Sequence, residues 1–163
     1  MNRHSPPFRH LIRSAALMLL VVTTGAFAQS VQEHVHHASH GVMPFEMSKT
    51  IHVFTMTQSG GVQRVIVKDP AALDQVALIQ EHLKHESARF QQGDYADPKR
   101  LHGAGMPGLA ELEAAGSKLQ VSYAPLPDGA QITFFTTDVA LLTAVHRWFG
   151  AQLSEHGADA RSE

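Results

Sequence analysis

Residues 53–73 read VFTMTQSGGVQRVIVKDPAAL, and the predicted fold follows from this stretch. Two runs that overlap it, 50–57 and 62–69, alternate β-branched or aromatic residues with polar ones, which is the period-two pattern of strands. The turn between them, QSGG at 58–61, supplies the positive φ that a hairpin needs. A helix from Asp69 to about residue 92 follows, because the Asp-Pro dipeptide offers an N-cap and a proline at the first helical position.

Residues 121–141, VSYAPLPDGAQITFFTTDVAL, repeat this pattern. A second hairpin joins 118–125 to 130–137 around a Pro-Asp-Gly turn, and an aspartate caps a second long helix over 139–156. The sequence therefore predicts an α+β fold of duplicated β-β-α units. These form a four-stranded antiparallel sheet with two long helices on one face, plus a short helix after the 93–109 loop.

The first 28 residues are typical of a secretory signal peptide. Arg3, Arg9 and Arg13 precede the apolar run AALMLLVV, which is too short to span a bilayer, and a small-x-small site ends at Ala28. We predict cleavage there, no integral membrane segment in the mature chain, and a periplasmic or secreted location. A retained N-terminal anchor is the alternative.

Cleavage would leave 135 of the 163 residues, which suits one domain. We predict a flexible leader rich in His and Met over 29–48, a single α+β domain over 49–157 and a disordered tail over 158–163.

Composition excludes several classes of function. Without the three N-terminal arginines the chain has 10 basic against 15 acidic residues, a formal charge of −5, so we expect no nucleic-acid partner. The absence of cysteine excludes disulfides, thiolate zinc sites, iron–sulfur clusters and covalently attached haem. The chain has 12 histidines, which makes metal binding the leading hypothesis.

The first long helix carries three candidate site residues. His82 and Glu86 lie together at the edge of its apolar stripe, where the carboxylate would orient the imidazole from the second shell, whereas His85 points to water. An ordinary surface pair is the alternative. The predicted stripe consists of Ala72, Leu73, Val76, Ile79, Leu83 and Phe90.

The loop segment HGAGMPG, from His102 to Gly108, carries an imidazole and the thioether of Met106. Glycines let such a loop fold tightly, and functional side chains concentrate on loops. Imidazole with thioether and no thiolate favours copper. Zinc, or haem held by His and Met, is the alternative cofactor. The competing interpretation is that Met106 fills the core and His102 binds a backbone carbonyl.

The second long helix adds His146 and His156 as candidate metal ligands. His146 lies beside the only tryptophan, and the competing interpretation is a partly buried histidine whose hydrogen bonds are satisfied. His156 lies near the centre of the apolar stripe at the helix end, where it could instead hydrogen-bond the last carbonyls. The leader histidines are expected to capture metal ions; they are His34, His36, His37 and His40. The alternative is a solvated leader whose histidines have no specific role.

Three segments, HGAGMPGLAEL, LPDGA and HRWFGAQLSEHGADA, resemble a group of small exported bacterial proteins of unassigned function, over residues 50–160. Some similar sequences carry the name aspartate carbamoyltransferase. The S-T-R-T-R carbamoyl-phosphate loop and the H-P-x-Q segment of that family are missing from this chain. The resemblance therefore implies an exported domain and carries over no catalytic residues.

The predicted function is binding of a transition-metal ion, most readily copper, by His82, His102 and Met106. The alternative is a non-catalytic interaction or small-molecule-binding domain of the cell envelope with structural histidines. A metal-dependent enzyme is disfavoured because only Glu86 and Asp94 are at hand as general bases. The sequence leaves any protein partner undetermined.

Overall fold

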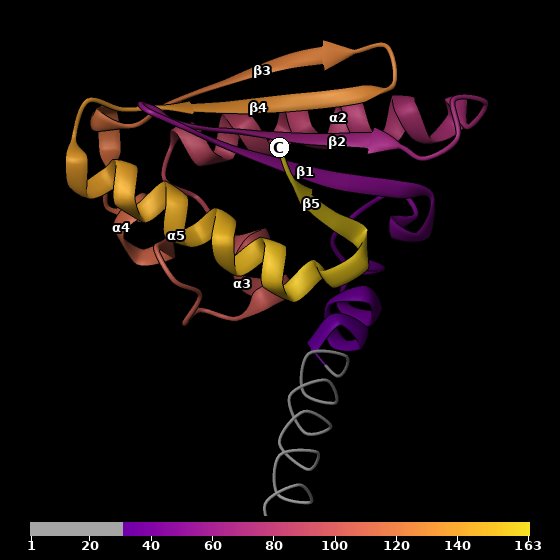
Figure 1. Cartoon of the computed structure of the whole chain (residues 1–163), viewed down its shortest axis with the longest axis horizontal. Coiled ribbons are helices and arrows are strands. Elements are labelled where there is room, and N and C mark those ends of the chain that lie inside the picture. The colour runs from indigo at the N-terminus through magenta and orange to yellow at the C-terminus, as the bar shows by residue number, and fades with distance from the viewer. Residues whose placement is uncertain (1–30) are drawn as a thin grey trace, which may run out of the picture.

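The structure, a computed structural model, describes residues 31–163 (Figure 1). The predicted signal peptide, 1–28, lies outside the described residues. Residues 31–39 form a helix that leads toward the first strand. The elements that follow, in chain order, are η1 (Met47–Lys49), β1 (Thr50–Thr57), β2 (Gly60–Val67), α2 (Leu73–Gln91), α3 (Ala96–His102), α4 (Leu109–Glu113), η2 (Gly116–Lys118), β3 (Gln120–Leu126), β4 (Gly129–Phe135), α5 (Val139–His156), η3 (Gly157–Asp159) and β5 (Ala160–Ser162).

The fold is α+β, as predicted, and the sheet has the strand order β3-β4-β2-β1-β5. The two predicted hairpins form its four antiparallel strands. The prediction is wrong at one edge, because the expected disordered tail 158–163 contributes a fifth strand. β5 pairs parallel to β1 from His52 to Phe54, which makes the sheet mixed. This pairing satisfies backbone groups that would otherwise form an exposed strand edge.

The register of the sheet follows the duplication in the sequence. At the centre of the sheet Gln63 pairs with Ile132, and Arg64 pairs with Gln131. When 53–73 is aligned with 121–141, Gln63 corresponds to Gln131 and Arg64 to Ile132. The central pairs therefore exchange equivalent positions, as a pseudo-twofold axis between β2 and β4 requires.

Both long helices cover the same face of the sheet, but each mainly contacts the hairpin of the other repeat. α2 packs chiefly on β3 and β4, and α5 packs on β2, β1 and β5. α3 and α4 follow α2 in the chain and lie below the sheet, where α4 contacts α5 (Figure 1). The largest side chains that are fully buried in the core are Trp148, Tyr95, Phe54, Phe134, Phe149, Ile79, Leu109 and Leu112.

The first of the two long helices, α2, begins later than predicted. The Asp69 carboxylate accepts a hydrogen bond from the Ala71 N–H at 2.9 Å, which forms an Asx turn, and α2 begins at Leu73. The Leu73 side chain is 69% exposed, so its assignment to the apolar stripe was wrong. The start of α2 lies past the turn, where the sheet does not cover it.

Residues 31–48 are ordered, which corrects the prediction of a flexible leader. Val35 and Met47 pack with Leu101 of α3 in a small apolar cluster, and Phe45 joins the main core. Burial of these four side chains offsets the entropy lost on ordering the segment. The segment therefore forms one wall of the domain.

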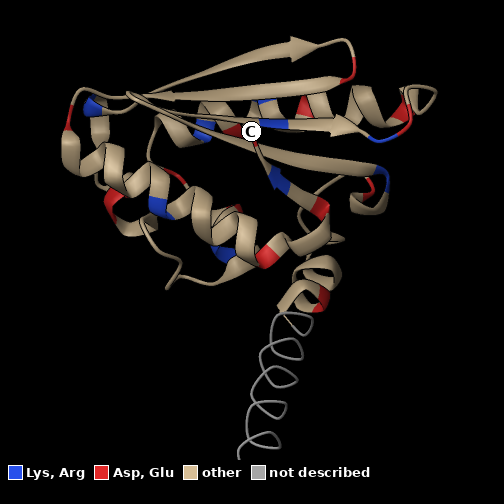
Figure 2. Ribbon diagram, viewed as in Figure 1, with Lys and Arg blue, Asp and Glu red and all other residues tan. Residues whose placement is uncertain are grey.

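Within residues 31–163, no helix combines the length and the apolar character needed to cross a membrane. Basic and acidic residues are interspersed along the described ribbon (Figure 2).

Candidate functional site: a cavity lined by buried histidines

A cavity of about 50 Å³ lies between the sheet, α2, α3, α5 and residues 42–45. A buried water needs roughly 10–15 Å³ of such volume. The cavity therefore accommodates a few water molecules or a small ion, and it is too small for a porphyrin. The polar residues that line it are His52, Gln63, His82, Glu86, Asp97, His102, Trp148 and Gln152.

His102 is the most strongly oriented group in this lining. It ends α3, not a loop as predicted, and its side chain is 1% exposed. Its Nδ1 donates a hydrogen bond to the Glu155 carboxylate of α5 at 2.7 Å. Its Nε2 is buried and has no partner among the described residues. A carboxylate that holds one ring nitrogen and leaves the other free is the arrangement found around metal-bound histidines.

The imidazoles of His52, His102 and His156 form a contiguous buried cluster. His156 lies with its ring centroid 4.6 Å from that of His52, nearly parallel to it, and 5.0 Å from that of His102, edge to face. Nδ1 of His52 and both ring nitrogens of His156 have no hydrogen-bond partner within residues 31–163. His52 lines the cavity directly, whereas His156 does not line it and contacts the ring of His52.

The buried histidines are neutral at neutral pH. Burial lowers the pKa of His52 to about 4, with a further contribution from His102. Burial likewise lowers the pKa of His82 to about 4, although Asp97 opposes the shift. Burial also lowers the pKa values of His102 and His156. Neutral imidazoles offer lone pairs without competition from protons, as metal binding requires.

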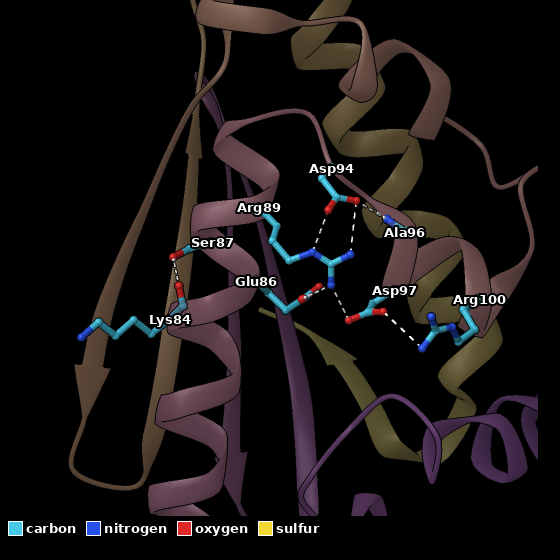
Figure 3. Close-up of polar contacts among 8 residues, drawn as sticks. All are labelled: Lys84, Glu86, Ser87, Arg89, Asp94, Ala96, Asp97 and Arg100. Atoms are coloured by element: carbon cyan, nitrogen blue, oxygen red, sulfur yellow. Dashed lines mark hydrogen bonds and ion pairs between the residues drawn. The ribbon is translucent and has the colours of Figure 1, made fainter.

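An ion-pair network fixes the joint between α2 and α3 beside the cavity (Figure 3). The Arg89 guanidinium binds Glu86 at 3.0 Å, Asp94 at 2.9 Å and Asp97 at 2.6 Å. Burial, reinforced by Asp97, raises the pKa of Glu86 to about 7, whereas Arg89 opposes this shift. Arg89 thus sets the position of α3, which ends at His102.

The structure brings together part of the predicted ligand set. His82 and His102 line the same cavity, with Glu86 beside them. Met106 does not line it, because its side chain is 5% exposed in the main hydrophobic core. Met106 is therefore surrounded by core residues, as the competing interpretation expects. The thioether at the cavity belongs to Met43.

The other predicted ligands lie elsewhere. His85 is exposed on the outer side of α2. His146 donates from Nε2 to the carbonyl oxygens of Thr57 and Gly60, at 3.0 and 2.9 Å, and so ties α5 to the first hairpin. Of the leader histidines, His34 and His37 are exposed on the helix 31–39, and the rings of the other two, His36 and His40, contact each other edge to face.

Sequence analysis missed His52, Met43 and Glu155. The period-two pattern of β1 contained a signal for His52, because it shares a face with the core residue Phe54. Met43 lies in the segment 29–48, which the sequence predicts to be a flexible leader without a fixed site. No local pattern links Glu155 to His102, which is 53 residues away in the chain.

Among residues 31–163, no three His, Cys, Asp or Glu side chains are already arranged to hold a metal ion. Compared with known proteins, the chain matches no family model, no curated protein and no solved structure. Function must therefore be argued from the chemistry of the cavity.

Proposed function

We propose that the protein is an exported binding protein for a transition-metal ion, which it takes into the cavity on the imidazoles of His52, His82 and His102. Binding requires side-chain rotations that turn these rings toward one ion. The cavity has room for an ion with a water molecule.

The observation that carries this proposal is the state of His102. Its ring is neutral, is held at Nδ1 by Glu155 and lines the cavity, while its Nε2 is left unpaired within the described part of the chain. A buried nitrogen without a partner costs about 1–3 kcal/mol. An ion bound at Nε2 would turn this cost into a favourable interaction.

The donor set favours Cu(I). Imidazole nitrogens bind copper, zinc and nickel alike, whereas a thioether selects Cu(I). Met43 supplies that thioether at the cavity wall. Zn(II) would instead draw on Glu86, whose carboxylate is engaged by Arg89.

The test is a titration of protein purified without an affinity tag, with Cu(I) in competition with a chromogenic chelator and with Zn(II) in parallel. We expect one tight Cu(I) site. Because partners of ligating histidines contribute roughly 10–100-fold to metal affinity, Glu155→Gln should weaken it by about tenfold and His102→Ala by more.

A matched pair of substitutions tests the thioether. Met43→Leu should weaken Cu(I) binding more than Zn(II) binding, while Met106→Leu should change neither. Cu(I) affinity that is unchanged by His102→Ala would exclude the cavity as the site. His34→Ala, an exposed histidine on the helix 31–39, serves as the control.

A second candidate function is binding of a small polar molecule in the same cavity. The side chains of Gln63 and Trp148 line this cavity, and Gln63 Oε1 and Trp148 Nε1 are buried without hydrogen-bond partners among residues 31–163. They offer an acceptor and a donor to a small polar molecule. Native mass spectrometry of metal-free protein tests this: a retained small molecule that is lost in Gln63→Leu, with Cu(I) affinity intact, would favour it.

A further inference from the structure

A wide surface groove runs outside the cavity, between residues 40–44 and α2. It has a volume of about 860 Å³ and is far more open to solvent than the cavity. The turn that leaves the helix 31–39 forms one wall, and the exposed side of α2, from Glu81 to Ala88, forms the other.

The groove and the cavity are adjacent, and the residues that line both spaces form the partition between them. Val42, Met43, His82 and Asp97 line both spaces. A ligand that moves from the groove to His102 would pass these four residues.

Histidines gather at the outer side of this partition. His40 lines the groove from the turn and His85 lines it from α2, one helical turn after His82. Both are exposed, and the ring centroid of His36 lies 5.7 Å from that of His40. Imidazoles on both walls are suited to transition-metal ions. The charged residues of the lining are Glu81, Lys84 and Asp97, and the Asp97 carboxylate binds Arg89, so the imidazoles are what would attract the ion.

We infer that this groove is the access route to the cavity, and that His40 and His85 form with His82 an outer site that captures a transition-metal ion before it reaches His102. The inference rests on the proposed function and extends it to how the ion enters. His82 is the shared residue, since it lines both the groove and the cavity.

The test measures uptake rate and affinity separately. Cu(I) is delivered as its complex with a chromogenic chelator, and stopped-flow absorbance follows release of the chelator. Because outer capture raises the local concentration of the ion, the double variant His40→Ala/His85→Ala should slow uptake by about tenfold. Its equilibrium affinity at the cavity should stay unchanged, since neither residue lines it.

Two further variants separate this inference from the proposed function. His34→Ala/His37→Ala removes two exposed histidines of the same helical segment that do not line the groove, and should leave the uptake rate unchanged. His102→Ala should retain a weaker Cu(I) site, which disappears when His40 and His85 are also replaced. Unchanged uptake in the His40/His85 variant would overturn the groove inference alone. Absence of tight binding in the unaltered protein would overturn the cavity proposal.

Discussion

His156 is the least satisfied residue of the described chain, because a fully buried imidazole keeps both ring nitrogens without a partner there. A neutral imidazole always carries one donor and one acceptor, so burial costs it two hydrogen bonds. The neighbouring rings of His52 and His102 give it contact area but no hydrogen bond. Such a residue lowers the stability of the metal-free protein, and selection for stability alone would favour an apolar side chain here.

We therefore expect His156→Leu to stabilise the metal-free protein. Burial lowers the pKa of His156 well below its ordinary 6.5. As the pH falls below that ordinary value, the unfolded state takes up a proton that the folded state refuses, so the free energy of unfolding falls. Urea denaturation should show a gain of about 1–3 kcal/mol for the variant at about pH 5 and a smaller gain at about pH 7.5. A loss of stability that is equal at both pH values would contradict this account.

At the scale of elements, the joint between α2 and α3 depends on one cation. Arg89 is the shared partner of Glu86, Asp94 and Asp97, and the Glu86 side chain is only 6% exposed. The guanidinium geometry suits several carboxylates at once, which a lysine cannot reproduce. The joint holds the helix with His82 against the helix with His102.

Arg89→Ala should cost about 3 kcal/mol, because it leaves the buried Glu86 and the partly buried Asp97 without their shared counter-ion. Chemical denaturation measures this, and Glu86→Gln added to Arg89→Ala should recover part of the loss. Arg100→Ala is the matched control: Arg100 is 65% exposed and reaches only Asp97, at 3.8 Å, so the change should stay within about 0.5 kcal/mol. Equal losses in the two single variants would show that the joint does not depend on the shared cation.

At the scale of the whole molecule, residues 160–162 add an edge strand to the sheet beside the histidine cluster. β5 pairs with β1 from His52 to Phe54, and Glu163 forms an ion pair with Arg64 of β2. β5 is therefore an edge strand that shields β1, the strand carrying His52.

Deletion of residues 160–163 should cost about 1–2 kcal/mol, because it removes the parallel pairing with β1. It should also speed amide hydrogen exchange at Val53 and its neighbours, which nuclear magnetic resonance can follow residue by residue. Glu163→Gln removes the ion pair alone and should cost less than about 1 kcal/mol. If the deletion leaves stability and exchange unchanged, the edge strand does not contribute to the fold.

The local patterns of the sequence predicted the hairpins and long helices but only part of the site. Alternation identified β1 to β4, and helical periodicity placed His82 at the edge of the apolar face of α2. The same reasoning paired His102 with Met106 through their short spacing. In the structure Met106 enters the core while His102 turns to Glu155, since residues four apart diverge once the helix ends at His102.

The sequence by itself determined the α+β class, the two repeats and their hairpins, because these depend on periods of two and 3.6 residues along the chain. The pairing of β2 with β4, which joins the two hairpins, was decided by the tertiary structure. Only the tertiary structure decided which histidines meet. His52, His102 and His156 come from a strand, a short helix and the end of a long helix, and no local period relates such positions. Packing of the helices on the sheet brings them together, and burial then keeps all three uncharged.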